Sequence, residues 1–494
     1  MMQNIKDTFL KALARIKENQ LVTFFSGDKG KDLMKRSAGF VFGPGINNYI
    51  IAHELCFVVI YKLILTITYV LLQSSLFEYA GFLCEFHMIR FIAGWVLYLV
   101  TFRFIRSSSD DVGSLFLYTI FLLSIAPFIV FFEYSAQCKL WMVLLQLCSL
   151  LLIRFLLNIK IVSFFKLPRI SYTHKNLRLG VSAFLVLFLV YTVIRFGFPD
   201  FSLLSFENIY LIRKEVEIST LESILQNVVC KILCPIYLIV ALREKKWLGT
   251  GLAVLVQLYV YAVTGFKTYL FIPVLILVLQ LFPKLSIKQT VLAGLPAGLL
   301  AVDSVYSIVA SKMLYALVGN RVIFLPAQIK YCYFDYFSRY EFVYFSQSTF
   351  AKLFGIKSNY GLNIPNLIGA VYYNKPEMWT NTGFMADAYA NLGVIGMVLI
   401  SLLMAGLLIV LRQALRGTTG YYKKMWHSLF IIFFIALNDG ALITTLFSGG
   451  LLAAILVALF VDFREPKAGK QETPPAAPEE YPSDYLGRMH FETD

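Results

Sequence analysis

Long runs of apolar residues constrain this chain more than any other feature of its sequence. Stretches such as 183–190, 252–263 and 399–411 are built mostly of Leu, Ile, Val, Phe, Ala and Met. A segment of roughly 20 such residues matches the thickness of the hydrocarbon core of a bilayer. Because 58% of the 494 residues are hydrophobic and only 15% are charged, a soluble fold could not cover so much apolar surface. The sequence therefore predicts an all-α, polytopic integral membrane protein.

Twelve segments of the chain are expected to cross the membrane as helices. They lie at about 50–72, 87–104, 113–132, 139–157, 179–197, 226–242, 247–264, 268–282, 290–311, 386–411, 427–440 and 445–462. Lys and Arg gather in every second connection, as at 103–106 and 243–246, whereas the connections between these are mostly neutral or acidic. Because short cytoplasmic loops carry the excess of Lys and Arg, this alternation predicts that both termini are cytoplasmic.

The regions that flank the transmembrane domain, which we place at 49–463, are polar. Residues 1–48 carry apolar side chains at helical spacing among basic ones, which predicts either an amphipathic helix on the inner membrane surface or a cytosolic extension. Residues 464–494 are rich in Pro, Glu and Ala and are expected to form a disordered cytoplasmic tail. The net charge of +14 follows from the basic loops, so no nucleic-acid partner is implied.

Two connections on the predicted outer face are long, at about 198–225 and 312–385, and neither contains an apolar run of span length. The second is net basic and is dense in aromatic residues. Such density is typical of a helix lying at the membrane interface, where rings sit at the level of the headgroups. Tyr331 and Tyr336 are also candidates for stacking on sugars. The basic character of this outer loop favours an anionic partner.

Ionisable residues at membrane depth are costly, so each of them is a candidate for function. The cations near the outer ends of the predicted spans and in the outer loops that we expect to bind an anionic substrate are Arg195, Arg213, Lys214, Lys267 and Arg321. An Arg presents a planar fork that matches phosphate oxygens, and Arg321 stands near the start of the basic outer loop. Each of these cations also has a simpler interpretation as an anchor to the headgroups.

Two carboxylates of the predicted outer face are candidate general bases. Asp335 and Arg339 are four residues apart, so on a helix they share a face and form an ion pair. Asp387 and Asn391 are also one turn apart, at the start of an apolar helix, where a carboxylate stabilises the helix dipole. Arg339 and Asn391 are further candidates for contacting the substrate. Residues 438–439 are interpreted as a turn. No His or Cys spacing typical of a metal site and no nucleotide-binding motif occurs, so neither a metal nor a cofactor is expected.

Several segments of the C-terminal half resemble those of a known family. They are GNRVIFLPAQ (319–328), YCYFDYFSRY (331–340), NTGFMADAYANLGVIG (381–396) and TLFSGGLL (445–452). Together with a long outer loop after a late span, they are similar to the bacterial Wzy-type polymerases, which join oligosaccharide repeat units in O-antigen and capsule synthesis. The resemblance covers the chain from about residue 264 onward. It implies a protein of the bacterial cytoplasmic membrane with a GT-C-like helical fold.

The resemblance also implies a reaction, the transfer of a glycan at the outer membrane face. The donor is a glycan on undecaprenyl pyrophosphate, and the growing chain moves onto the non-reducing end of another lipid-linked repeat unit. Arg321, with Lys267 or Arg213, is then expected to stabilise the leaving pyrophosphate. Asp387 or Asp335 is expected to act as the base towards the acceptor hydroxyl. A flippase and a chain-length-regulating co-polymerase are implied partners, and no cofactor is implied.

Other functions remain compatible with the sequence. An O-antigen ligase has a similar shape, but such ligases use a histidine in an outer loop, and His87 is the only histidine expected outside. A lipid-linked oligosaccharide flippase or secondary transporter also suits twelve spans. Transporters usually place charges and broken helices at the midplane, whereas here the polar groups crowd one face. A structural partner of a polysaccharide assembly complex is the remaining alternative.

Overall fold

A computed structural model describes residues 46–159, 170–171, 174–199, 216–309, 312–348, 351, 355 and 357–462. Helices dominate these residues, and the single β-pairing among them is a parallel one between β1 (Ile170–Ser171) and β2 (Val461–Asp462). Of the predicted N-terminal segment 1–48, residues 1–45 lie outside the described residues, as does the predicted tail at 464–494. The same is true of Arg213 and Lys214.

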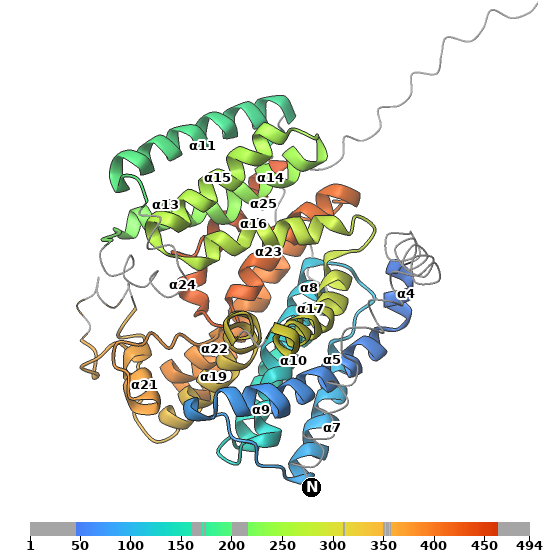
Figure 1. Ribbon diagram of the computed structural model, residues 1–494, viewed down its shortest axis with the longest axis vertical. Helices are drawn as coiled ribbons and strands as arrows, with labels where there is room; N and C mark the ends of the chain where they lie inside the picture. The colour runs from blue at the N-terminus through green and yellow to red at the C-terminus, as the bar shows by residue number, and fades with distance from the viewer. Residues whose placement is uncertain are drawn as a thin grey trace, which may run out of the picture.

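The helices form two groups that meet along α23 (Gly420–Ala436), as Figure 1 shows. The larger group, in the lower part of the figure, contains α4 (Ile46–Ala52), α5 (Glu54–Thr68), α7 (Met88–Ile105), α8 (Val112–Ile120), α9 (Ala126–Tyr134), α10 (Leu140–Leu157), α17 (Ile287–Val309), α19 (Leu325–Phe337), α21 (Ile364–Tyr373) and α22 (Phe384–Ala414). The smaller group contains α11 (His174–Phe196), α13 (Thr220–Val228), α14 (Cys234–Arg243), α15 (Trp247–Thr264), α16 (Lys267–Leu281) and α25 (Leu451–Phe460). Because α23 packs against α8 and α17 as well as against α14 and α16, it joins the two groups.

Nine helices among the described residues are long and apolar enough to cross a membrane, which makes this a polytopic helical membrane protein. They are Glu54–Leu76, Met88–Ile105, Val112–Tyr134, Leu140–Leu157, Arg178–Phe196, Thr220–Arg243, Trp247–Thr264, Ile287–Val309 and Phe384–Ala414. Each of them coincides with a predicted span. The other three predicted spans correspond to α16, α23 and α25, which have 15, 17 and 10 residues. The total of twelve spans therefore stays a prediction.

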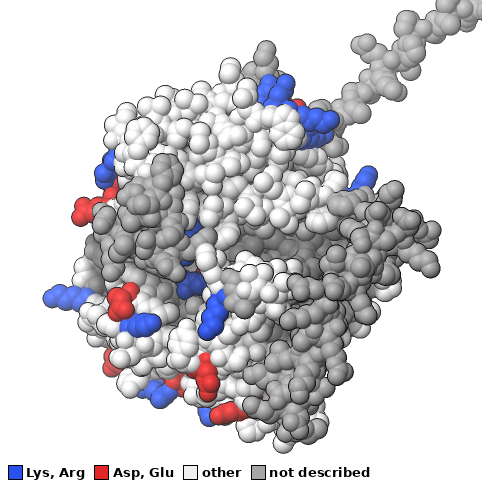
Figure 2. All heavy atoms as spheres, in the orientation of Figure 1, with Lys and Arg blue, Asp and Glu red and all other residues white. Residues whose placement is uncertain are grey.

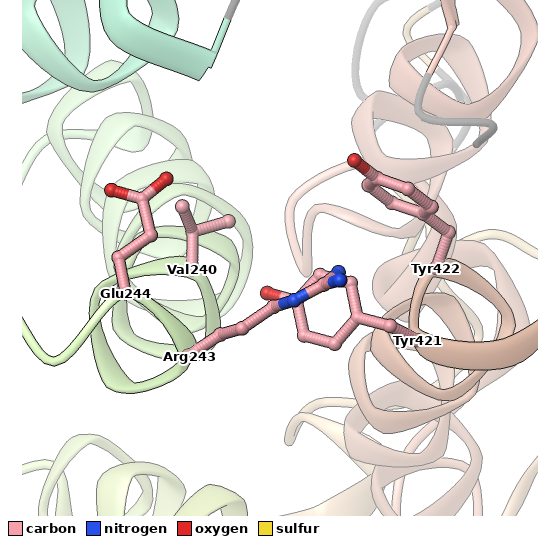
Figure 3. A pocket seen from close by; sticks show the side chains of 5 residues that line it. All are labelled: Val240, Arg243, Glu244, Tyr421 and Tyr422. Atoms are coloured by element: carbon pink, nitrogen blue, oxygen red, sulfur yellow. The ribbon is translucent and has the colours of Figure 1, made fainter. Parts of the chain in front are cut away.

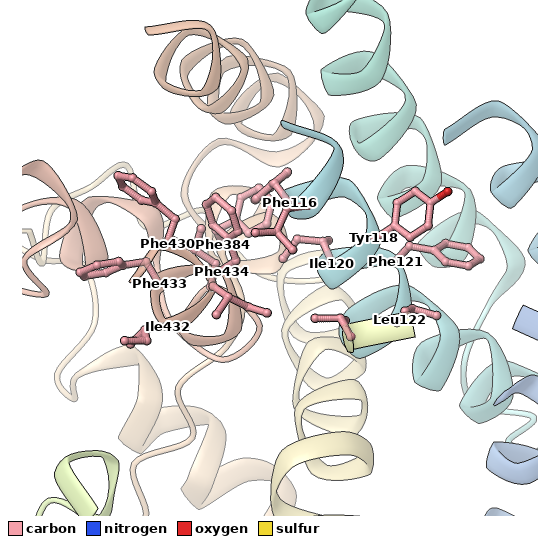
Figure 4. Close-up of a cluster of buried hydrophobic side chains, with 14 of the residues drawn as sticks. Phe116, Tyr118, Ile120, Phe121, Leu122, Phe384, Phe430, Ile432, Phe433 and Phe434 are labelled. Carbon is pink, nitrogen blue, oxygen red and sulfur yellow. The ribbon is translucent and has the colours of Figure 1, made fainter. Parts of the chain in front are cut away.

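The core of the protein lies around the helix Val112–Tyr134, which is buried along its apolar length. Figure 4 shows the aromatic cluster at which this helix meets α22 and α23. The Phe116 ring packs edge-on against Phe434, with 5.2 Å between centroids, and lies 6.1 Å from the ring of Phe384. In a bilayer, close packing of this kind holds helices together, because lipid tails are as apolar as the side chains.

A widened π-helical turn precedes a proline in the helix Val112–Tyr134. The turn is η3 (Phe121–Ile125), and Pro127 stands in the first turn of α9. The amide of Ala126 bonds the carbonyl of Phe121, so the next carbonyl, that of Leu122, faces a proline without an N–H. The hydroxyl of Tyr61 donates to the Leu122 oxygen at 3.0 Å. A buried side chain of α5 thus supplies the missing donor and ties two helices together.

The same arrangement recurs in the second group of helices. There η5 (Val229–Leu233) precedes Pro235, and the amide of Gln257 on α15 donates to the carbonyl of Cys230 at 2.6 Å. A buried carbonyl without a partner costs about 1–3 kcal/mol. The prolines therefore make these helices depend on a polar side chain of a neighbour, which fixes how the helices pack.

Replacing Tyr61 with Phe is expected to lower the free energy of unfolding by about 1–3 kcal/mol, because the buried carbonyl of Leu122 loses its only donor outside the helix. Thermal or denaturant unfolding of the purified protein in detergent measures this loss. Pro127→Ala restores a backbone N–H, so in that background the Tyr61→Phe change should cost less than half as much. Equal costs in the two backgrounds would show that this hydrogen bond contributes nothing to stability.

The helix α22 is broken near its start, although the sequence predicts a continuous span at 386–411. Leu392 and Gly393 depart from helical geometry, and Gly393 has φ 60° and ψ −141°, a conformation that is accessible mainly to glycine. A Cβ at this position would also lie 2.7 Å from the ring of Phe342. The prediction of one continuous helix was wrong because a glycine in an apolar run does not reveal its backbone angles. The break leaves a short helical segment, 384–391, to carry Asp387.

The long outer connection predicted at 312–385 is largely structured. Its first part forms one continuous helix through α18 (Lys312–Tyr315), η6 (Ala316–Phe324) and α19. The aromatic residues of α19 are buried against α9, α21 and α22, so these rings pack against the protein and do not face headgroups as expected. The physical reason is that these rings fill a space between helices. A high aromatic content is expected both of such a core and of a membrane interface, so composition alone does not distinguish the two.

Several basic residues at the predicted cytoplasmic ends of the helices form ion pairs. The ammonium of Lys423 lies 2.8 Å from Asp110, and the guanidinium of Arg412 lies 3.0 Å from Asp111. Glu54 is nearly buried and lies 3.1 Å from the Arg106 guanidinium. These pairs join α5, α7, α8, α22 and α23 at one end of the bundle.

Candidate functional site

Three cations gather around one carboxylate where the two groups of helices meet. Arg321 comes from η6, Lys330 from α19 and Lys231 from η5, and each interacts electrostatically with Asp439, which follows α23. We call these four residues the cation cluster. Its charges are three positive and one negative, so it carries an excess of positive charge. A cluster with this excess is suited to bind a multiply charged anion.

Asn438 connects the parts of the cation cluster. Its side-chain oxygen accepts a hydrogen bond from the ammonium of Lys330 at 2.6 Å, and its amide donates to the carbonyl of Val322 at 3.2 Å. Val322 lies in the widened turn before Pro326, so Asn438 ties the end of α23 to this turn. The residues interpreted as a turn from the sequence therefore hold two helices in register and place Asp439 between the cations.

Gly383 allows this close packing. A Cβ at position 383 would lie 2.5 Å from the carbonyl oxygen of Asn438 and 2.9 Å from Cε of Lys330, distances at which neighbouring atoms must move. Gly383 is also the residue that directly precedes α22. The start of α22 thus lies against the cation cluster, and the NTG sequence at 381–383 is explained by packing.

Two members of the cation cluster, Arg321 and Asp439, are exposed to solvent, whereas Lys330 is buried. The side chain of Asp439 is exposed, yet the surrounding protein raises its pKa against the opposing charges of Arg321, Lys330 and Lys231. The carboxylate of Asp439 is thus accessible to solvent and at the same time surrounded by protein, as is expected of a group that lines a hollow. Figure 2 shows Lys and Arg side chains inside a hollow between the two groups of helices. An anion can therefore reach the cluster from outside the protein.

Arg321 is the most available cation of the cluster. Its side chain is exposed, and within the described part of the chain it forms neither a hydrogen bond nor an ion pair. Its neighbour Asn320 accepts a hydrogen bond from Gln73 at 2.8 Å, and Gln73 in turn accepts one from the hydroxyl of Tyr315 at 3.0 Å. This network fixes the backbone on which Arg321 stands and leaves its guanidinium available to a ligand.

Asp387 is an acidic side chain of the same helix start, on α22. It stands one turn after Gly383 in α22, and its carboxylate forms no hydrogen bond among the residues that the structure describes. Burial, and then the charge of Asp387, raise the pKa of Tyr333 on α19, so the carboxylate lies close to the helix that carries Lys330. The Tyr333 hydroxyl donates instead to the carbonyl of Thr380 at 3.0 Å. Asp387 thus keeps its oxygens free to accept a proton.

Lys330 makes the stability of the protein depend on pH. Burial lowers its pKa to about 7, and the charge of Asp439 only partly opposes this shift. In the unfolded chain a lysine keeps its proton up to about pH 10.4. Between these values the unfolded state binds more protons, so stability is expected to rise from pH 7 to pH 10.

Replacing Lys330 with Met should remove this contribution. We expect the midpoint of thermal unfolding to rise less between pH 7 and pH 9 in the variant than in the unchanged protein, because all other titrating groups are common to both. Parallel unfolding curves in detergent at the two pH values provide the measurement. An identical rise in both proteins would mean that Lys330 keeps its proton in the folded state.

Several of the residues proposed from the sequence have protein partners instead. Asp335 forms the predicted ion pair with Arg339 and also accepts a hydrogen bond from the Tyr372 hydroxyl at 2.5 Å. Arg195 pairs with Glu222, with 2.9 Å between Nε and Oε1. The carboxylate of Asp335 and the guanidinium groups of Arg195 and Arg339 are thus engaged within the protein, which makes them weaker candidates than Arg321 and Asp387.

The expected substrate contacts of Asn391, Tyr331 and Tyr336 are corrected by the structure. The amide of Asn391 donates to the carbonyl of Asp387, and its side-chain oxygen accepts from the Phe345 backbone, each at 2.9 Å. Tyr331 and Tyr336 are each only 8% exposed, and their neighbours are other aromatic rings. The faces expected to stack on sugars are occupied by the protein.

Lys267 stands at the start of α16, at the same end of the helix bundle as the cation cluster. Two residues later the hydroxyl of Tyr269 donates to Asn227 at 3.2 Å, and Asn227 is one turn before Lys231. Lys267 has interactions of its own within the protein. The structure thus keeps it near the site, without making it part of the cation cluster.

The sequence reasoning missed Lys231 and the functional setting of Lys330 and Asp439. A signal for Lys231 was present, because it is a lone cation in the apolar run VVCKILCPIY (228–237) and such residues mark functional or paired positions. The buried ion pair of Lys62 and Glu133, with 2.5 Å between Nζ and Oε2, was also missed, although each of these residues is a lone charge in an apolar run.

The fold and the site define a class: a polytopic helical membrane protein with three cations gathered around one carboxylate. No protein-family model matches the chain, and neither the curated proteins nor the solved structures contain a match. The function of the site must therefore be argued from its chemistry.

Proposed function

We propose that this chain is a membrane glycosyltransferase that polymerises undecaprenyl-pyrophosphate-linked oligosaccharide repeat units at the outer face of the bacterial cytoplasmic membrane. The observation that carries the proposal is the cation cluster with its excess positive charge, against which the start of α22, the helix that carries Asp387, is packed. Glycosyl transfer from a lipid pyrophosphate needs both elements at one place: fixed cations for the leaving group and a base for the acceptor.

The reaction is a displacement at the anomeric carbon of the donor glycan. A hydroxyl at the non-reducing end of the acceptor unit forms the new glycosidic bond, and its proton passes to Asp387. The bond between the anomeric carbon and the pyrophosphate oxygen breaks, and the pyrophosphate keeps the electron pair. Arg321 and Lys231, with Lys330 in its protonated form, stabilise the negative charge that develops there. The products are a lengthened lipid-linked chain and undecaprenyl pyrophosphate.

The surface near the site is compatible with a lipid substrate. On α17 the side chains of Leu300, Ile308 and Val309 are exposed, as is expected of a helix that faces lipid. The hollow between the two groups of helices is visible from the same side (Figure 2). A polyprenyl tail in the bilayer could thus deliver its charged head to the cation cluster without leaving the membrane.

The direct test is the conversion of one purified lipid-linked repeat unit into a ladder of longer products by the purified protein. Supporting evidence comes from a strain that lacks the gene, which should carry single repeat units on its surface lipid. A surface lipid without any repeat unit would instead identify a ligase. A flippase that supplies the substrate and a chain-length-regulating co-polymerase are the proposed partners in the cell.

The second candidate function is a lipid-linked oligosaccharide flippase or transporter. The break of α22 at Gly393 favours it, because discontinuous helices often form the binding sites of transporters. Proteoliposomes separate the two functions. A flippase moves the intact substrate across the bilayer and makes no longer product, whereas a polymerase lengthens substrate that is already on the outer side.

A further inference from the structure

A second polar cavity lies at the opposite end of α23 from the cation cluster. It has a volume of about 230 Å³ and is lined by Val240, Arg243 and Glu244 of the α14 end and by Tyr421 and Tyr422 of α23 (Figure 3). The cluster residue Asp439 follows the last turn of α23, whereas Tyr421 is in the first. A helix of 17 residues is roughly 25 Å long, so the two sites are separate.

Two groups in this cavity lack the partners that their chemistry requires. The guanidinium of Arg243 lies 4.0 Å from the ring centroid of Tyr421 and 5.9 Å from that of Tyr422, and it has no ion pair within the described residues. The hydroxyl of Tyr421 is buried and has no hydrogen-bond partner there. The carboxylate of Glu244 also lines the cavity, but it pairs with Arg178. The cavity therefore offers one positive charge and one hydrogen-bond donor to a ligand.

The surroundings of the cavity indicate where the ligand comes from. Lys245 and Lys246 follow directly after Glu244 and are exposed. The next residues, Trp247 and Leu248, are 72% and 93% exposed at the start of α15. Tryptophan at the end of a spanning helix is typical of the headgroup level of a bilayer, and basic residues at that level attract anionic lipids. The cavity thus opens where lipid phosphates are concentrated.

We propose that this cavity binds the phosphate of an anionic membrane phospholipid. Arg243 presents its fork to the phosphate oxygens, the Tyr421 hydroxyl donates to one of them, and Val240 packs against the apolar part of the lipid. By the distribution of Lys and Arg, the lipid belongs to the cytoplasmic leaflet. Because the cavity joins α14 to α23, a bound lipid would hold together the two groups of helices that enclose the cation cluster.

The test measures lipid retention by the purified full-length protein. Native mass spectrometry after incubation with equal amounts of phosphatidylglycerol and phosphatidylcholine should show preferential binding of phosphatidylglycerol. Arg243→Gln and Tyr421→Phe should each reduce that preference about tenfold, since each removes a hydrogen bond to a charged group. Arg416→Gln is the matched control, because it removes an exposed basic residue at the same end of the bundle and should leave the preference unchanged.

Competition identifies the source of the phosphate. Inorganic phosphate in large excess should not displace phosphatidylglycerol, because it lacks the apolar part of the lipid. Displacement by phosphate at low concentration would overturn the proposal in favour of a soluble anion. An equal loss of preference in the Arg416→Gln control would show that the preference comes from general surface charge and not from the cavity. Unchanged unfolding midpoints in the variants separate lost binding from misfolding. Arg243→Lys keeps the charge without the planar fork, so its preference for phosphatidylglycerol should lie between those of the unchanged protein and Arg243→Gln.

Discussion

Replacing Arg321 with Ala is expected to abolish chain elongation while leaving the protein folded in the membrane. Arg321 is the cation that has no partner of its own in the described structure, so its removal leaves no buried charge behind. The loss of one fixed donor to a developing negative charge usually costs about 10²–10³ in rate. In the ladder assay this corresponds to the disappearance of products beyond the first few additions. Arg321→Lys should recover part of the activity, because it keeps the charge but lacks the planar fork.

Lys375→Ala is the matched control for Arg321. Lys375 is an exposed cation of the same outer connection, and it follows α21. Its removal changes the net charge of this region by the same amount and should leave elongation near the level of the unchanged protein. Polymer of full length from the Arg321→Ala protein would eliminate its role and would transfer the binding of pyrophosphate to Lys231 and Lys330.

Asp387→Asn is expected to lower the rate of transfer by about 10²–10⁴, the usual contribution of a positioned general base. The substitution keeps the size of the side chain and removes only its ability to take a proton. Binding of the donor lipid should survive, because the cation cluster is unchanged. The measurement is a single-turnover assay with labelled donor, in which the bound fraction stays constant while the rate of product formation falls.

Two further variants make this prediction sharp. Glu377→Gln neutralises an exposed carboxylate between α21 and α22 and should not affect the rate. Asp335→Asn tests the rival base, whose oxygen is already engaged with Arg339 and Tyr372. If the rate of transfer fell in Asp335→Asn and was unchanged in Asp387→Asn, Asp335 would be the general base.

The cation cluster is expected to lower the stability of the folded protein when no ligand is bound. Lys330 is buried with a neutral amide as its hydrogen-bond partner, and the three cations of the cluster face the single carboxylate of Asp439. Uncompensated charge of this kind is unfavourable in a protein interior. It becomes favourable when a pyrophosphate enters, because the ligand supplies the missing negative charges. The expected consequence is a protein that is stabilised by its own substrate.

Part of the site could be predicted from the sequence. Arg321 and Asp387 were recognisable because each is an ionisable residue in or beside an apolar helix, and such residues need a reason. Asp335 and Arg339 were correctly expected to pair, since the spacing of four residues brings them together on any helix. Tyr331 and Tyr336 were misjudged, because aromatic side chains serve equally well on a surface and in a core, and sequence does not say which neighbours they meet.

By itself, the sequence determined that the chain is a helical membrane protein and where its apolar helices lie, because helix length and bilayer thickness are matched locally. Only the tertiary structure decided which charges gather. Lys330 meets Asn438 across 108 residues of sequence, and Lys231 reaches the same Asp439 from another helix. Contacts between such distant residues depend on how helices pack. That packing is set in part by widened turns before prolines, by a glycine with unusual backbone angles and by buried side chains that complete a neighbour's hydrogen bonds.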